Sequence, residues 1–213
     1  MGPSMFRILR FAMSAAVAAC AWLIIQPAPA TGSAPIATAA AVGASISVPW
    51  GWVDFCQRYV GECGSGPLAA ADIRLDSHAL DDIKRVNLWV NTHVQPETDM
   101  DHWGVIDRWD LPFDGRGDCE DYALLKRKLL IQMGYPRQAL LMTVVHDSAD
   151  EGHAVLTVKT DRGDFVLDNL NDSIRPWTNT DYSFVKRQSQ EDPNVWVKIL
   201  PPAIASVAGA SAM

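Results

Sequence analysis

The chain has 213 residues, of which 48% are hydrophobic and 20% are charged, and its formal net charge is −7 at pH 7. This length is enough for one domain with a substantial core. The acidic balance argues against nucleic acid or an anionic membrane surface as the partner.

The first 30 residues are typical of a secretory signal peptide. Arg7 and Arg10 precede an apolar run from Phe11 to Ile25, and the small residues that follow predict cleavage after Ala30. The apolar run is short for a membrane span, so an uncleaved anchor is the minor alternative, and no later segment reaches the required length. We therefore expect a periplasmic protein whose mature chain has no membrane span. Cleavage leaves 16 Lys and Arg against 25 Asp and Glu, a net charge of −9.

Composition divides the remaining chain into three parts. Residues 31–47 are mostly Ala, Gly, Ser and Thr, which predicts a flexible leader, and residues 201–213 begin with two prolines and predict a disordered tail. Residues 48–200 carry the apolar and aromatic residues that a core requires, so we assign them to the folded domain.

The cysteines give a first indication of function. Cys56 and Cys63 lie close together in a loop-forming context, and in an oxidising compartment they can pair and leave Cys119 alone. A single thiol of this kind is a candidate reactive group, although a buried free cysteine can also be a small core residue. A zinc site is less favoured, because no second Cys pair and no His pair at ligand spacing accompanies these cysteines.

A helix is predicted from Leu80 to Val94, where apolar residues recur at helical spacing and Pro96 follows. The connection from Asp99 to Pro112 is rich in aromatic and acidic residues. Long ordered loops are often functional, and we expect this one beside Cys119. Its tryptophans either line a substrate groove or anchor the loop in the core.

A second helix is predicted to begin at Cys119. Asp118 can cap it, apolar residues recur at helical spacing as far as Met133, and Gly134 and Pro136 end it. Cys119 then lies in the first turn, where free N–H groups and the helix dipole favour a thiolate.

The acidic neighbours of Cys119 oppose this effect. Asp118, Glu120 and Asp121 bring three carboxylates close to the sulfur, and their charge raises the pKa of the thiol. Two interpretations remain open at this point. Either these acids only cap the helix, or they bind a hard cation, most plausibly calcium, that cancels the local charge.

Three strands follow the second helix. They are predicted at 140–146, 153–158 and 164–168, and the last two are joined by a turn at 160–163. An antiparallel hairpin places His153 and Asp168 roughly opposite each other, which is the geometry a carboxylate needs to orient an imidazole. Cys119, His153 and Asp168 are then a candidate nucleophile, base and orienting acid.

The motifs that contain these residues resemble the bacterial transglutaminase-like cysteine peptidase family. The resemblance covers about residues 49–200, and its segments are Gly117–Lys126, Gly152–Leu156, Val166–Asn169, Val86–Asn91 and Trp109–Pro112. It implies an α+β, papain-like (transglutaminase-core) fold, in which a helix that carries the cysteine packs on an antiparallel sheet that carries His and Asp. It also implies that Cys119, His153 and Asp168 are the catalytic triad.

One branch of this family processes large biofilm adhesins in the periplasm and depends on calcium. The resemblance to this branch implies calcium ligands at Asp118 and Glu120, a protein substrate such as a surface adhesin, and an inner-membrane regulatory receptor. We expect thiol-dependent acyl transfer, with the Cys119 backbone N–H as one oxyanion donor and Trp109 or Asn91 as candidates for the second. The alternatives are a catalytically silent binding module, and transglutamination or cell-wall peptide hydrolysis on the same fold.

Overall fold

The computed structural model describes residues 39–64 and 66–201, so the predicted signal peptide, the first part of the leader and the tail after Pro201 lie outside the described residues. The helices are α1 (Trp50–Arg58), α2 (Ser77–His93), α3 (Asp99–Trp103) and α4 (Cys119–Gln132), with short 3-10 helices η1 (Arg137–Ala139) and η2 (Trp177–Asn179). The strands are β1 (Val42–Ile46), β2 (Gln95–Pro96), β3 (Arg116–Gly117), β4 (Leu140–His146), β5 (Gly152–Thr160), β6 (Gly163–Asp168), β7 (Asn171–Pro176), β8 (Ser183–Gln188) and β9 (Trp196–Ile199).

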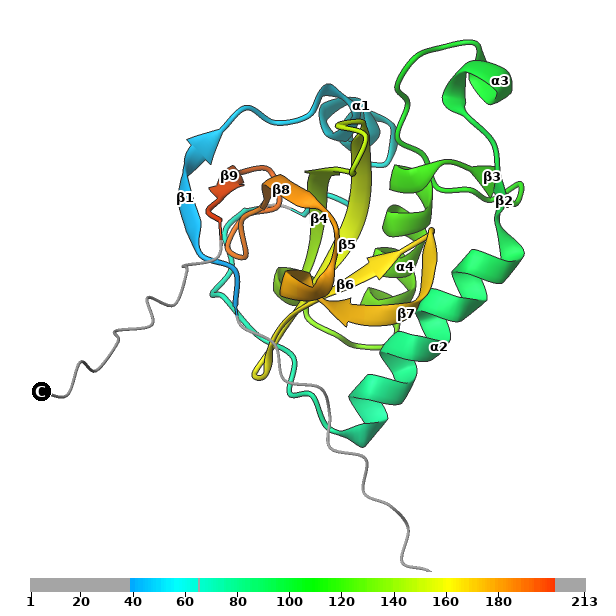
Figure 1. Ribbon diagram of the computed structural model, residues 1–213. Helices are drawn as coiled ribbons and strands as arrows, with labels where there is room; N and C mark the ends of the chain where they lie inside the picture. The colour runs from blue at the N-terminus through cyan, green and yellow to red at the C-terminus, as the bar shows by residue number, and fades with distance from the viewer. Residues whose placement is uncertain (1–38, 65, 202–213) are drawn as a thin grey trace, which may run out of the picture. The chain divides into compact units, whose positions relative to one another are not determined.

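Seven strands form one antiparallel sheet in the order β1-β9-β8-β4-β5-β6-β7 (Figure 1). Strands β4 to β7 are a meander, in which each strand turns back beside the one before it, and β8 returns to the free side of β4. The β4–β5 and β5–β6 turns lie at opposite ends of the meander, so the start of β5 and the end of β6 lie at the same end. His153 and Asp168 are at that end.

Helix α4 packs directly on β4, β5 and β6, and α2 packs against α4 and β7. Alternation along the strands sends every second side chain toward these helices. The main core contains Leu156 and Leu167 from the sheet, Leu124 from α4 and Val90 from α2, all at most 2% exposed. A smaller apolar cluster contains Val155, Val166 and Trp177. Val155 and Val166 are the sequence neighbours of Leu156 and Leu167, so their side chains lie on the other face of the sheet. The core therefore fixes the first turn of α4 against the start of β5.

The predicted α+β architecture is confirmed, and its strands agree closely with the sequence. Strand β4 has the predicted limits, and β5 and β6 extend the predicted segments by one or two residues at their ends. The helix predicted from Leu80 begins three residues earlier, because Asp76 occupies its N-cap and accepts a hydrogen bond from the Ala79 N–H. None of the helices in residues 39–64 and 66–201 is long and apolar enough to cross a membrane.

The expected flexible leader is too long. Residues 42–46, which the composition assigned to it, form β1 and pair with β9 at the edge of the sheet. Just before this strand, the Ala40 N–H donates to the buried Asp164 carboxylate at 2.9 Å. The backbone needs no apolar side chains to make these bonds, so a segment of Ala, Gly and Ser gives little sign of them in its sequence. The folded part therefore begins by residue 40.

The Cys56–Cys63 pair is bonded, with a Cα–Cα distance of 5.6 Å. The loop expected around it is partly helical, because Cys56 lies in α1. Trp52 and Phe55 bury their rings beneath this helix, and Gly51 lets it approach the Trp109 indole so closely that a Cβ would clash. The disulfide thus closes the end of α1, and α1 is packed on the segment that precedes Cys119.

Residues 95–117 form a closed loop beside α4. Its two ends pair as the parallel strands β2 and β3, and it carries the short helix α3 (Figure 1). The Gln95 N–H donates to the Gly115 carbonyl at 2.8 Å, and the Glu97 N–H donates to the Gly117 carbonyl at 3.0 Å. The predicted position of this loop beside Cys119 is confirmed, because the Asp110 N–H donates to the Asp121 carboxylate of α4 at 2.6 Å.

Candidate active site

A cleft of about 430 Å³ lies where the first turn of α4 faces the start of β5. Cys119 and His153 both line it, together with Asp118 and Glu120 on one side and Ala154 on the other. Trp50 from α1 and residues Ile106, Asp107 and Trp109 from the 95–117 loop complete the walls. The core packing described above therefore brings two of the three predicted triad residues to one cavity.

Cys119 is the free cysteine among the described residues and is partly exposed. Its thiol lies 3.0 Å from a Glu120 carboxylate oxygen, toward which it donates. Burial, and then the charge of Glu120, raise the pKa of the thiol well above its ordinary value, and a backbone hydrogen bond from Ala154 acts in the opposite direction. Burial and the neighbouring Glu120 therefore both oppose formation of the Cys119 thiolate.

His153 and Asp168 contact each other through their side chains. The His153 Nε2 lies 3.0 Å from Asp168 Oδ1, and the two side chains are 9% and 1% exposed. In the β5–β6 ladder Leu156 pairs with Leu167, so Asp168 falls opposite Val155 and diagonally from His153. The predicted side-chain pairing is present, although the register differs by two residues from the expected one. Because Asp168 engages Nε2, the second ring nitrogen, Nδ1, remains for a thiol.

Asp168 is held by more groups than the sequence indicated. Its Oδ1 also accepts a hydrogen bond from the Leu170 N–H at 3.0 Å, and its Oδ2 accepts one from the Tyr182 hydroxyl at 2.6 Å. Burial alone would raise the pKa of this carboxyl, but the hydrogen bonds from His153 and Tyr182 outweigh it and the pKa is lowered. Asp168 is therefore an anion fixed in orientation.

The competing histidines and aspartates have other partners. His78, His102 and His146 do contact carboxylates, at 3.3, 2.8 and 2.8 Å, but none of the three lines the cleft that holds Cys119. Asp164 binds Lys159 and Arg187, Asp161 accepts the Leu75 N–H, and Asp172 accepts from Asn91. Shared lining of one cleft, rather than a carboxylate partner, therefore distinguishes His153.

A cluster of buried carboxylates surrounds the first turn of α4. Asp99, Glu120 and Asp121 are 3%, 6% and 1% exposed, and candidate ligand atoms within 4.8 Å of one another occur in three sets: Asp118, Cys119 and Glu120; Asp99, Asp107 and Glu120; Asp99, Asp118 and Asp121. Burial is the main cause that raises the pKa of Asp99 to about 6 and that of Asp121 to about 8. Burial and then Asp118 also raise the pKa of Glu120 well above its usual range. Packed carboxylates of this kind require protons or a cation.

Asp118 occupies the N-cap position of α4 but does not cap it with its side chain. Its Oδ1 is buried and has no hydrogen-bond partner among the described residues. The capping interpretation is therefore wrong for Asp118. A buried carboxylate oxygen without a hydrogen-bond partner needs another partner, and a proton or a cation can supply it.

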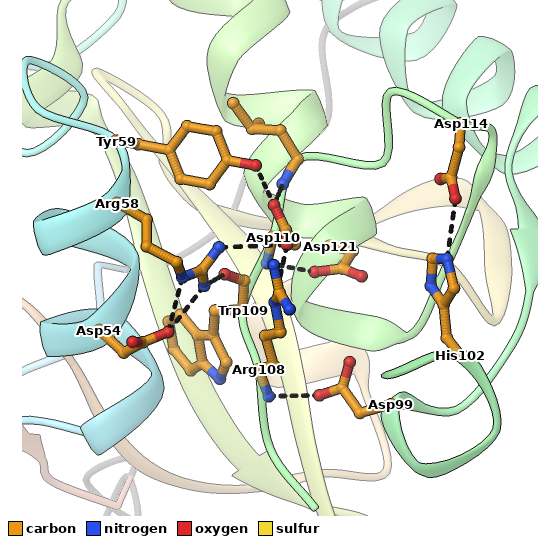
Figure 2. A network of polar contacts seen from close by, with 11 residues as sticks. Asp54, Arg58, Tyr59, Asp99, His102, Arg108, Trp109, Asp110, Asp114 and Asp121 are labelled. Atoms are coloured by element: carbon orange, nitrogen blue, oxygen red, sulfur yellow. Dashed lines mark hydrogen bonds and ion pairs between the residues drawn. The ribbon is translucent and has the colours of Figure 1, made fainter. Parts of the chain in front are cut away.

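A polar network attaches this acid cluster to α1 (Figure 2). Arg58 donates to the Trp109 carbonyl at 2.6 Å and pairs with the Asp110 carboxylate at 3.1 Å, and the Tyr59 hydroxyl also donates to Asp110. The Asp110 N–H in turn donates to Asp121 of α4. The part of the cleft wall that the 95–117 loop supplies is thus joined both to α1 and to α4, the helix that begins at Cys119.

The two candidates for a second oxyanion donor are engaged elsewhere. The Trp109 Nε1 donates to Asp107 at 3.0 Å. The Asn91 amide donates to the Asp168 carbonyl and to the Asp172 carboxylate, both at 2.9 Å, and so holds the β6–β7 turn. The sequence predicted that both residues lie near the site, but it does not show which groups accept hydrogen bonds from their side chains.

Comparison with known proteins places the chain in a family. A profile described as "Bacterial transglutaminase-like cysteine proteinase BTLCP" matches residues 42–203. No curated protein gives a significant match. Solved structures similar to the chain include calcium-bound Legionella pneumophila LapG, at 27% identity and a TM-score of 0.48 over 55% of this chain and 67% of that one. EGTA-treated LapG is 28% identical, with a TM-score of 0.44 over 50% of this chain and 61% of that one.

Proposed function

Because the chain belongs to the bacterial transglutaminase-like cysteine proteinases, which makes it a cysteine peptidase, we propose that Cys119, His153 and Asp168 are its catalytic triad. The observation that carries this proposal is the hydrogen bond between His153 and the buried Asp168 at a cleft that His153 shares with Cys119, the free cysteine of the described residues. A nucleophile, a base and an orienting acid are the groups that thiol-dependent acyl transfer needs.

The mechanism follows from the positions of these groups. His153 accepts the thiol proton through Nδ1 while Asp168 holds the ring through Nε2. The thiolate attacks a peptide carbonyl, and the imidazolium then gives its proton to the departing amine, which leaves a thioester on Cys119. Water, activated by the neutral imidazole, hydrolyses that thioester. The Cys119 N–H, at the start of α4, is the expected donor to the oxyanion.

We further propose that Asp118 and Glu120 bind calcium, with the neighbouring Asp99, Asp107 and Asp121 as additional candidate ligands. The clustered carboxylates, the unpaired Asp118 oxygen and the absence of a side-chain cap at Asp118 support this site. Carboxylate oxygens are the ligands that this hard cation prefers. When bound, the ion would neutralise the charge that raises the pKa of the Cys119 thiol and would fix the 95–117 loop beside the cleft.

A periplasmic location and an exported protein substrate complete the proposal. The disulfide between Cys56 and Cys63 supports an oxidising compartment, and the sequence motifs resemble those of adhesin-processing enzymes. We propose a surface protein such as a biofilm adhesin as the substrate, and an inner-membrane receptor as the regulator. Fractionation of cells that express the chain would test the location.

Thiol labelling tests the triad without knowledge of the substrate. The mature protein is treated with iodoacetamide in calcium or in EGTA, and the products are read by intact mass and peptide mapping. Rapid, single labelling of Cys119 that increases with calcium is the expected result, and Cys119→Ala removes it. Slow labelling that ignores calcium and is unchanged in His153→Ala would indicate a structural thiol, and a silent binding module would then replace the peptidase as the favoured function.

A peptidase assay separates hydrolysis from the other acyl transfers. Extracts of exported and surface proteins are incubated with the parent and with Cys119→Ala, and cleavage is followed by mass spectrometry. Cleavage by the parent alone is expected. Incorporation of a labelled primary amine without cleavage would instead identify transglutamination, and release of cell-wall peptides would identify a muropeptide substrate.

A further inference from the structure

Tyr182 contacts both His153 and Asp168, although the sequence gave no indication of it. Its hydroxyl donates to Asp168 Oδ2 at 2.6 Å, and its ring lies tilted against the His153 ring with 5.4 Å between the centroids. The residue stands directly before β8, two strands away from β5 in the sheet. The Tyr182 side chain thus contacts both the proposed base, His153, and the proposed orienting acid, Asp168.

The two carboxylate oxygens of Asp168 have different partners. Oδ1 lies against the His153 Nε2 and accepts the Leu170 N–H, whereas Oδ2 accepts the Tyr182 hydroxyl at 2.6 Å and has the Arg175 guanidinium at 3.6 Å. Without the bond from Tyr182, the carboxylate would lose its shortest contact and one restraint on rotation about its last torsion. Rotation would move Oδ1 away from the imidazole.

The Tyr182 hydroxyl remains a donor over the working pH range. Burial, followed by the adjacent Asp168 carboxylate, raises the pKa of the phenol, so it stays protonated. The ring also belongs to the margin of the apolar cluster around Val155, Val166 and Trp177. Its position is therefore fixed by packing as well as by the hydrogen bond.

We propose that Tyr182 is a positioning residue of the peptidase: its hydroxyl locks the orientation of Asp168 and its ring covers the His153–Asp168 hydrogen bond from solvent. The proposal rests on the proposed triad and deepens it. Tyr182 does not meet the substrate in this role. It acts through Asp168, which must be correctly oriented and ionised if His153 is to pair with the Cys119 thiolate.

The test measures the rate of Cys119 alkylation by iodoacetamide as a function of pH, in the mature protein with calcium. Tyr182→Phe keeps the ring and removes the hydroxyl. We expect the rate near pH 6 to fall about 10-fold, because Asp168 no longer holds the imidazole in place. The acid limb of the profile should also move to higher pH, because Asp168 loses a charge-assisted hydrogen bond and protonates more readily. The other groups that face Asp168 are unchanged in this variant: His153, Arg175, the Leu170 N–H and, by its charge, Lys126. Tyr182→Ala also uncovers the hydrogen bond and should lose more.

Tyr135→Phe is the matched control. The Tyr135 hydroxyl also donates to a buried carboxylate, Asp82, at 2.8 Å, but neither residue lines the cleft. This variant should unfold at lower denaturant concentration, as a lost buried bond predicts, yet its alkylation profile should match the parent. A profile that is also unchanged in Tyr182→Phe would overturn the positioning role.

His153→Ala separates the failure of this inference from the failure of the triad. If His153→Ala abolishes rapid alkylation while Tyr182→Phe does not alter it, the triad stands and Tyr182 is merely structural. If His153→Ala leaves the Cys119 profile unchanged, the triad itself is wrong, and the role of Tyr182 falls with it. A shifted profile in Tyr182→Phe, with an unshifted one in Tyr135→Phe, supports both.

Discussion

His153 and Asp168 are diagonal neighbours on β5 and β6, joined by a hydrogen bond of 3.0 Å between Nε2 and Oδ1. Asp168 contributes a full negative charge to this contact, since its pKa is lowered despite its burial. When His153 takes the thiol proton during catalysis, this charge stabilises the imidazolium that forms. The charge of Asp168, and not only its shape, should therefore appear in the pH dependence of catalysis.

Asp168→Asn keeps the shape of the side chain and removes the charge. We expect peptidase activity to fall about 10-fold or more, because the imidazolium that forms on His153 during catalysis loses the anion that stabilises it. Iodoacetamide alkylation of Cys119 across pH measures thiolate formation without a substrate, and its acid limb should move to higher pH in this variant. Asp172→Asn is the control, because that carboxylate contacts Asn91 and not His153. Equal shifts in the two variants would mean a general charge effect and would contradict the triad.

The sequence predicted which residues belong to this site better than it predicted how they lie relative to one another. Cys119, His153 and Asp168 stand in segments with clear helix and strand patterns, so their elements could be placed from periodicity alone. The diagonal register was missed because the two-residue turn at Asp161 and Arg162 pairs Thr160 with Gly163, whereas direct opposition of His153 and Asp168 requires the centre of the turn one residue earlier. Tyr182 was missed for a different reason. Its contact spans 14 residues of sequence and depends on the path from β7 to β8.

The acid cluster shows a similar limit. The family resemblance implied calcium ligands at Asp118 and Glu120, whereas Asp99 and Asp107 come from a loop with no regular pattern. Its acidic composition was visible, but only the folded loop shows which acids point toward α4. The predicted end of the leader was wrong because β1 is held mainly by backbone hydrogen bonds, which leave no pattern in the side chains of the sequence.

Calcium should stabilise the protein through the acid cluster. At a free concentration of 100 times its dissociation constant, a cation that binds the folded state alone adds about 2.7 kcal/mol to the free energy of unfolding. Asp118→Asn combined with Glu120→Gln should lose this gain, and in EGTA it should be at least as stable as the parent, because two crowded charges are gone. Thermal unfolding in calcium and in EGTA measures both effects.

The control for this experiment carries the same change in charge at exposed positions, Asp81→Asn with Glu191→Gln. It should respond to calcium as the parent does. An unchanged calcium response in Asp118→Asn with Glu120→Gln would contradict the proposed ligands and leave those carboxylates as protonated partners of one another.

The disulfide should support the fold and not the chemistry. Cys56 and Cys63 are separated by seven positions, and the loss of so short a cross-linked loop costs about 2 kcal/mol on a chain-entropy basis. Cys56→Ser with Cys63→Ser should therefore unfold at lower urea concentration, yet Cys119 should react with iodoacetamide at the parental rate under native conditions. A large loss of Cys119 reactivity in a folded variant would instead show that the end of α1 helps to shape the cleft.

Lys126 is the most unusual charged residue of α4, because its side chain is 0% exposed and its ammonium nitrogen has no hydrogen-bond partner among the described residues. Burial lowers its pKa to about 7, against the attraction of Asp168 and Asp172. A folded-state pKa below the unfolded value of 10.5 means that the ammonium destabilises the fold fully below pH 7. The effect disappears as pH rises from about 7 toward 10, where the unfolded chain also loses the proton.

Lys126→Met should therefore raise the free energy of unfolding by about 3 to 5 kcal/mol at pH 6, and the gain over the parent should shrink steadily toward pH 10. Urea unfolding at a series of pH values measures it. Lys128→Met, on the same helix, is the control, because that ammonium is partly exposed and already paired with Glu62. It should lose at most about 1 kcal/mol at pH 6. If Lys126→Met is instead destabilised at pH 6, the charge of Lys126 is needed beside Asp168, and burial alone is the wrong account of this residue.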